Sequence, residues 1–121
     1  VQQLHLQDLV HHDLKPKNFV RYFDGRFRLV DFDNCKMVGR EMGATTLEIC
    51  APEMASALLT HRQLRADTSM DIWALGCCLY QMVTQRLLLE DLKPDWKGKL
   101  YEQPLEEGLR VVAGLEQATV D

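Results

Sequence analysis

The stretch Thr68–Thr84 constrains the fold of this chain most, because its apolar residues occupy nearly every face of a helix instead of a single stripe. Its opening, Thr68-Ser69-Met70-Asp71, is typical of a capping box, in which a hydroxyl and an acid satisfy the first backbone N–H groups. A helix that is apolar all round belongs at the centre of a domain. We therefore expect a buried central helix here.

A polar segment at residues 11–18 combines side chains that are suited to catalysis. Asp13, Lys15 and Asn18 provide a carboxylate, an amine and a carboxamide, and Pro16 keeps the segment out of a helix. A carboxylate on a stiff loop can accept a hydroxyl proton, and an ammonium can offset charge on a transferring phosphoryl group. The amide oxygen can hold a hard cation.

Two β-prone runs, 19–23 and 26–30, flank the dipeptide Asp24-Gly25. An Asp-Gly pair between such runs predicts a hairpin with a two-residue turn, in which both turn residues adopt positive φ. The hairpin would carry Asn18 at one end and Asp31 at the other. Its closure would bring these two candidate metal ligands together.

The remaining pattern predicts smaller elements around these three. We expect short strands at 9–11 and 35–38, a helix at Pro52–Leu59 that begins with proline, a loop-like segment at 91–103 and a weakly amphipathic helix at 105–119.

Several segments together resemble the motifs of eukaryotic protein kinases in their order and spacing. They are the catalytic loop at residues 11–18, the metal-binding pair Asp31-Phe32, the tripeptide Ala51-Pro52-Glu53 and the central-helix motif at residues 71–76. The resemblance implies an α+β, mainly α fold: the large (C-terminal) lobe of a protein kinase with a small β-hairpin layer, the N-terminal lobe being missing.

The resemblance also implies how the chain is organised. It covers residues 4–89, from the catalytic loop through the central helix, whereas residues 90–121 form a divergent helical part. A kinase domain is about twice as long as this chain. We therefore expect residues 1–121 to be one partial protein kinase domain, from a fragment or a truncated gene product that is inactive alone.

The function that the resemblance implies is Mg²⁺-assisted transfer of the γ-phosphoryl group of ATP to a Ser or Thr hydroxyl of a protein. Asp13 is implied as the catalytic base. Lys15 is implied as a catalytic and ATP-binding γ-phosphate partner, at a position typical of serine/threonine kinases. Asn18 and Asp31 are implied as ligands of Mg²⁺ and thereby of ATP, and Val20 as part of the floor beneath the adenine ring.

Two further residues each have a structural and a family interpretation. Thr46 precedes Ala51 at the spacing of a family threonine that bonds the catalytic Asp and Lys, but Thr45 and Thr46 are equally well explained as plain loop residues. Asp71 is either the acid of the capping box or, by resemblance, the residue that holds the backbone around His11. The sequence is compatible with both interpretations of each residue.

Two positions depart from the family pattern. His12 stands where the family has Arg, and because histidine is mostly neutral at pH 7, activation by a phosphorylated loop is disfavoured. Asp33 stands where the family has Gly, so a positive φ would be costly and a negative charge is added beside the metal site. A pseudokinase-type binding or scaffold module is therefore the first alternative. A small-molecule kinase is the second, disfavoured by the peptide-binding segment Ala51-Pro52-Glu53.

Composition limits the partners and the location. The net charge of −4 provides no electrostatic footprint for nucleic acid or an anionic membrane, and the longest apolar run is too short to span a bilayer. The four cysteines form no CxxC motif, so we expect reduced thiols and not a zinc site or a disulfide framework. We expect a soluble cytoplasmic protein whose partner is a Ser/Thr-bearing protein substrate, with an oligomeric state that the sequence leaves open.

Overall fold

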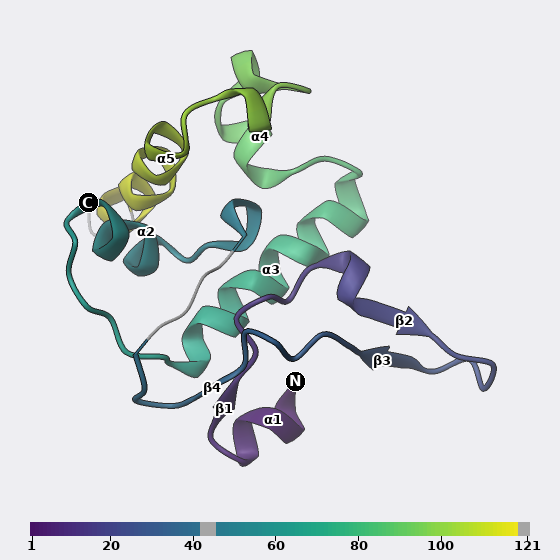
Figure 1. The fold of residues 1–121 in the computed structure, drawn as a ribbon. Coiled ribbons are helices and arrows are strands. Elements are labelled where there is room, and N and C mark those ends of the chain that lie inside the picture. Colours follow the sequence, from purple (N-terminus) through teal and green to yellow (C-terminus); the bar gives the residue numbers. More distant parts are fainter. Residues whose placement is uncertain (42–45, 119–121) are drawn as a thin grey trace.

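The computed structural model describes residues 1–41 and 46–118. These residues are mostly helical and carry two small antiparallel sheets. The helices are α1 (Gln2–Leu6), α2 (Pro52–Leu59), α3 (Thr68–Thr84), α4 (Leu88–Leu92) and α5 (Leu105–Ala118), and the strands are β1 (Leu9–Val10), β2 (Phe19–Arg21), β3 (Phe27–Leu29) and β4 (Lys36–Met37). In Figure 1, α3 runs through the middle of the molecule, with α2 and α5 on one side and α1 and the sheets on the other.

The central helix has the predicted bounds, but a different residue caps it. The side chain of Asp67 is the N-cap and accepts a hydrogen bond from the backbone N–H of Ser69 at 2.9 Å, and this bond lowers the pKa of Asp67. Thr68 is already the first helical residue. The predicted capping box is therefore wrong, and Asp71 is free for another role.

The prediction that α3 is buried on every side is only partly correct. One side of the helix packs against other described elements, whereas an apolar stripe on the other side is exposed. The buried residues are Met70, Asp71, Ala74, Cys77 and Cys78, and the exposed apolar residues are Ile72, Leu79, Met82 and Val83. The described elements thus cover α3 on one side.

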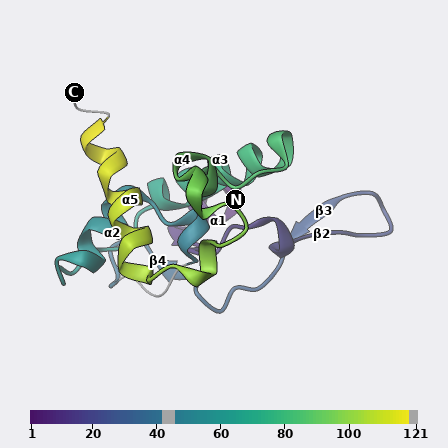
Figure 2. The same ribbon diagram turned by 90° about the horizontal axis from the view of Figure 1, so that it is seen from above.

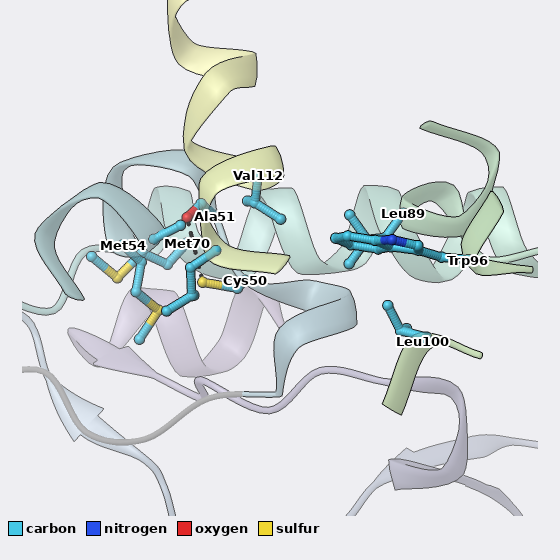
Figure 3. Packing of buried hydrophobic residues seen from close by; sticks show 10 residues of the cluster. Cys50, Ala51, Met54, Met70, Leu89, Trp96, Leu100 and Val112 are labelled. Carbon is cyan, nitrogen blue, oxygen red and sulfur yellow. Dashed lines mark hydrogen bonds between the residues drawn. The ribbon is translucent and has the colours of Figure 1, made fainter. Parts of the chain in front are cut away.

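The larger hydrophobic core joins α2, α5 and the segment that follows α4 (Figure 3). Its buried members are Cys50, Ala51, Met54, Ala55, Met70, Leu89, Trp96, Leu100, Leu109 and Val112. The segment predicted as a loop at 91–103 instead holds the end of α4 and two 3₁₀ turns, Pro94–Trp96 and Leu100–Glu102. These turns bury Trp96 and Leu100, whose apolar side chains gain from leaving water.

The hairpin β2–β3 has shorter strands and a longer turn than predicted. Phe19 faces Leu29 and Arg21 faces Phe27 across the ladder. Beyond them the Tyr22 N–H donates to the Arg26 carbonyl at 2.9 Å, which leaves a three-residue turn. Gly25 alone of the Asp-Gly pair has positive φ, +79°, as in hairpins whose turn ends in a left-handed residue. The hairpin projects from the body of the molecule (Figures 1 and 2).

The other predicted elements are present. Strand β1 pairs with β4, with Leu9 opposite Met37, and α2 has the predicted bounds with Pro52 in its first turn. Helix α5 follows the prediction as far as the chain is described.

All four cysteines are free, as expected. Burial raises the pKa of Cys50 to about 12 and that of Cys77 to about 11, so these thiols stay protonated. Within residues 1–41 and 46–118, no helix has the length and apolarity needed to cross a membrane.

Candidate active site

The loop at residues 11–18 is anchored to α3 by a buried aspartate. Asp71 is fully buried, and its two carboxylate oxygens accept hydrogen bonds from the backbone N–H groups of His11, at 2.7 Å, and of His12, at 3.0 Å. About two turns farther along α3, the Cys78 thiol donates to the Leu14 carbonyl at 3.1 Å. The family interpretation of Asp71 is thereby confirmed. The sequence offered no signal for the role of Cys78.

His12 is held in the left-handed region, with φ of 72°, and its side chain is 3 % exposed. Burial lowers the pKa of His12 below its ordinary value of 6.5, and the positive charge of Lys36 lowers it further, against an opposing effect of Asp71. The imidazole is therefore neutral at pH 7. This agrees with the expectation from the sequence that no permanent positive charge stands at this position.

His11 joins the loop to the end of the hairpin. The Asp13 N–H donates to His11 Nδ1 at 3.1 Å, so the ring proton lies on Nε2, which donates to the Val30 carbonyl at 3.2 Å. Phe32 meets the His11 ring edge-on, with ring centroids 5.4 Å apart. Phe32 thus lies beside His11, and it is 50 % exposed.

Three side chains converge on the carboxylate of Asp13, which is itself buried. Thr46 Oγ1 donates to Asp13 Oδ1 at 2.9 Å, while Lys15 Nζ lies 3.4 Å from Asp13 Oδ2 and donates to Thr46 Oγ1 at 3.2 Å. Asn18 Nδ2 donates to the Asp13 backbone carbonyl at 2.8 Å and to Oδ2 at 3.3 Å. The contacts expected of Thr46 are present, and Thr45 lies outside the described residues.

This arrangement gives Asp13 a fixed orientation and a charge partner. Hydrogen bonds to a charged acceptor are stronger than neutral ones, and the ammonium of Lys15 attracts the carboxylate at 3.4 Å. A positioned carboxylate can accept a proton from a hydroxyl placed within hydrogen-bond reach. Packing supports the loop from below, because Leu14 is fully buried against Ile49, Ala74 and Cys77.

Asp31 is linked to this group through the backbone of its neighbour, Val30. The Val30 N–H donates to the Asn18 carbonyl at 2.8 Å, so the two ends of the hairpin meet as predicted. Asp31 is exposed with φ of 62°, and its Oδ1 accepts from the Asp33 N–H at 3.3 Å. Positive φ in this turn occurs at Asp31 and not at Asp33, the position where the family has glycine. The described side chains of Asn18 and Asp31 share no hydrogen bond.

The donor atoms of Asn18 and Asp31 suit a hard cation such as Mg²⁺. The amide nitrogen of Asn18 is engaged by Asp13, which leaves its oxygen as the possible ligand atom, and Asp31 offers an exposed carboxylate. No cluster of three or more His, Cys, Asp or Glu side chains in the described chain could hold a metal by itself. Such a sparse set is compatible with Mg²⁺, which is commonly bound by one or two carboxylates together with substrate phosphates.

Val20, the residue expected under an adenine ring, lies on β2 opposite Arg28 and is 40 % exposed. Its side chain is therefore accessible to a ligand. Of the site residues taken from the sequence, the structure brings together Asp13, Lys15 and Asn18, whereas Val20 and Asp31 lie along the hairpin.

Comparison with known proteins points to one family. The protein kinase domain family matches residues 1–114. The serine/threonine-protein kinase mph1 of Schizosaccharomyces pombe is 35% identical over 105 residues, covering 77% of this chain and 15% of that protein. The serine/threonine-protein kinase MPS1 of Encephalitozoon cuniculi is 34% identical over 90 residues, covering 69% of this chain and 14% of that protein.

A solved structure shares the fold. The kinase PK-1 of Cydia pomonella granulovirus superimposes with a TM-score of 0.59, over 71% of this chain and 31% of that one, at 24% sequence identity. The chain thus spans about 15% of the length of the two curated relatives above.

Proposed function

The chain belongs to the eukaryotic protein kinase family, and from this premise we propose that it supplies the catalytic loop for transfer of the γ-phosphoryl group of ATP to a Ser or Thr hydroxyl of a protein. The observation that carries the proposal is the convergence of Thr46, Lys15 and Asn18 on the buried carboxylate of Asp13. The serine/threonine class is supported by the relatives from Schizosaccharomyces pombe and Encephalitozoon cuniculi, which are both named as serine/threonine-protein kinases.

Each residue has a proposed part in the reaction. Asp13 orients the substrate hydroxyl and accepts its proton, and the ammonium of Lys15 offsets negative charge on the group in transfer. Asn18 and Asp31 would hold Mg²⁺. When bound, the ion neutralises charge on the phosphates. Thr46 keeps Asp13 and Lys15 in register, since its hydroxyl bonds both.

The proposal also assigns the chain to a part of the kinase domain. Residues 1–121 would belong to the large, C-terminal lobe, with the catalytic loop through central helix at 4–89 and a divergent helical part at 90–121. The mostly helical architecture and the position of α3 beneath the loop support this assignment. ATP contacts from a second lobe, and a cytoplasmic location with access to ATP and Mg²⁺, are parts of the same proposal.

A binding or scaffold module without catalysis is the second candidate, and two residues favour it. His12 is neutral where a permanent cation would pair with a phosphorylated loop, and Asp33 bonds Asp31 and adds negative charge next to it. Asp33→Gly would discriminate between these candidates. If Asp33 suppresses catalysis, this change raises turnover; if the site is competent, turnover changes little.

A thermal-shift titration of the intact protein with ATP, with and without Mg²⁺, tests the proposal together with a phosphorylation assay on a generic protein. If the protein is an enzyme, we expect ATP to raise its Tm in a Mg²⁺-dependent way, and Asp31→Asn to reduce this rise. We also expect phosphorylation of Ser or Thr in the generic protein. Good folding and ATP binding without any turnover would support the scaffold.

A further inference from the structure

The end of the β2–β3 hairpin, residues 21–28, projects from the body of the molecule and is exposed along its whole length (Figures 1 and 2). Three aromatic side chains lie on this hairpin tip. Phe23 is fully exposed, Phe27 is 68 % exposed and Tyr22 is 45 % exposed. Large apolar side chains that are exposed together mark an interaction site more often than a plain surface does. The hairpin tip is therefore a candidate docking surface.

The hairpin tip is also positively charged. Three arginines stand against one aspartate within residues 21–28, whereas the whole chain has a net charge of −4. The arginines are Arg21, Arg26 and Arg28, and the aspartate is Asp24. The composition of the whole chain conceals this local excess of positive charge. The low electrostatic footprint inferred from the net charge therefore does not apply to the hairpin tip.

Local contacts engage Asp24 and hold one arginine beside a ring. Asp24 accepts a hydrogen bond from the Arg26 N–H at 3.0 Å, and its carboxylate lies 3.3 Å from the Arg28 guanidinium. That guanidinium also lies over the Tyr22 ring, 4.7 Å from its centroid. Within residues 1–41 and 46–118, the side chains of Arg21 and Arg26 form no ion pair. Their guanidinium groups are thus available to an anionic partner.

We propose that the hairpin tip docks on an anionic lipid bilayer, with the Phe23 ring among the headgroups and the arginines on lipid phosphates. Aromatic rings are favoured at the membrane–water interface, and the guanidinium fork matches phosphate geometry. Each arginine near an anionic leaflet adds to the attraction. The inference goes beyond the proposed phosphoryl transfer and does not depend on it.

The shape of the hairpin tip favours a bilayer over a peptide or a nucleic acid. A fluid interface can surround a projecting end that carries an aromatic ring at its apex and cations beside it. A bound peptide instead lies in a groove or along a sheet edge, and single-stranded nucleic acid follows a positively charged groove. The hairpin tip is a projection and offers neither kind of groove (Figure 2).

The acids that follow the hairpin do not cancel this attraction. Strand β3 ends at Leu29, and Asp31 and Asp33 come after it, at the end of the strand away from the turn. Strands rise about 3.3 Å per residue, so Asp31 is roughly 10 Å along the chain from Arg28. This distance is about one Debye length at physiological salt, so repulsion between Asp31 and a bilayer at the hairpin tip is largely screened.

Co-sedimentation of the intact protein with lipid vesicles tests the inference. Vesicles of phosphatidylcholine with about 30 mol% phosphatidylserine are compared with phosphatidylcholine alone at several NaCl concentrations. We expect a partition coefficient about tenfold higher for the anionic vesicles, falling as salt rises. Phe23→Ala should lower it about tenfold, because the ring no longer leaves water. Arg26→Gln should lower it about fivefold, through loss of one cation near the surface.

Matched variants elsewhere on the surface separate the hairpin tip from a general effect of charge or apolarity. Arg62→Gln, at an exposed position after α2, and Leu105→Ala, at an exposed position on α5, should each leave the partition coefficient within about twofold of the unmodified protein. Circular dichroism establishes that each variant is folded.

Insertion of the ring is tested separately with Phe23→Trp. Vesicles that contain brominated lipids should quench the fluorescence of this variant more than that of the unmodified protein. In the unmodified protein Trp96 is buried and Trp73 is half-buried, so lipid bromine reaches them less. Equal quenching in the two proteins would contradict insertion of residue 23.

Three results would overturn the inference. They are failure to bind anionic vesicles at low salt, equal binding to anionic and neutral vesicles, and binding that Phe23→Ala and Arg26→Gln leave unchanged. Single-stranded RNA and a glutamate-rich peptide are tested in parallel. If either of them binds through the hairpin tip while the vesicles do not, the partner belongs to another class of molecule and the bilayer proposal is wrong.

Discussion

Asp71 and His11 are joined by a hydrogen bond of 2.7 Å between the Asp71 carboxylate and the His11 backbone N–H, across 60 positions of the chain. The same carboxylate accepts from the His12 N–H and contacts His5 Nε2 at 2.9 Å. One buried side chain of the central helix thus fixes the backbone immediately before Asp13. The proposed chemistry depends on this anchor.

Asp71→Asn should destabilise the loop strongly. The amide keeps the size of the side chain but replaces one acceptor oxygen with a donor, which leaves a buried backbone N–H unpaired. We expect the free energy of unfolding to fall by about 3 kcal/mol, with faster hydrogen exchange at the His11 and His12 amides. Asp95→Asn, at an exposed site, is the matched control and should change stability by less than about 0.5 kcal/mol. If the His11 and His12 amides in Asp71→Asn exchange as slowly as in the unmodified protein, Asp71 does not anchor the loop.

Thr46→Ala should reduce turnover by about tenfold or more, because Asp13 and Lys15 both lose a hydrogen-bond partner. Thr46→Ser restores the hydroxyl and should stay within about threefold of the unmodified protein. Steady-state phosphorylation of a peptide measures both variants. If the alanine and serine variants behave alike, the hydroxyl has no part in positioning the site.

His12 should make stability depend on pH in a defined direction. Burial lowers its pKa in the folded protein below the ordinary 6.5, so the unfolded chain binds more protons between these two pKa values. The stabilisation is complete above about pH 7 and is lost as the pH falls through 6.5 towards the folded pKa. Urea titrations at a series of pH values measure the slope.

Replacement of a histidine supplies the control for that experiment. His12→Gln should flatten the slope between pH 7 and pH 5, whereas His61→Gln, at an exposed position, should leave it unchanged. An unaltered slope in His12→Gln would show that the proton uptake occurs elsewhere.

Met54→Ala should test the contact between α2 and α5. Met54 is 2 % exposed in the larger core, and its truncation should lower the free energy of unfolding by about 2–5 kcal/mol. Leu58→Ala removes an apolar side chain from the same helix at a site that is 44 % exposed, and should cost much less. Similar losses in the two variants would mean that α5 does not cover α2.

The regular elements could be predicted because their causes are local. Pro52 sets the start of α2 and the long apolar run sets the extent of α3, so both helices have the expected bounds. The sequence predicts Thr68 as the cap of α3, whereas the structure has Asp67 there. Either residue type can cap a helix, and the extended backbone of Asp67, with φ of −140°, decides between them.

The site could be predicted in part, for a different reason. Asp13, Lys15 and Asn18 occur within one short segment, so their shared chemistry could be predicted from the sequence, and their side chains do lie together. The bridge from His11 to Val30 and the bond from Cys78 to Leu14 join residues far apart in the chain. Neither a histidine nor a cysteine in a sequence indicates which distant backbone carbonyl it will contact, so these two hydrogen bonds could not be predicted.

The central claim is that the carboxylate at position 13 takes the proton of a serine or threonine hydroxyl. Its most direct test is the rate of phosphoryl transfer to a serine peptide by the intact protein and by its Asp13→Asn form, with ATP affinity measured on both. We predict that the rate falls by about 10²–10⁴-fold while the Kd for Mg·ATP changes little. An Asp13→Asn protein that retained its transfer rate, with its fold and nucleotide binding intact, would contradict the account.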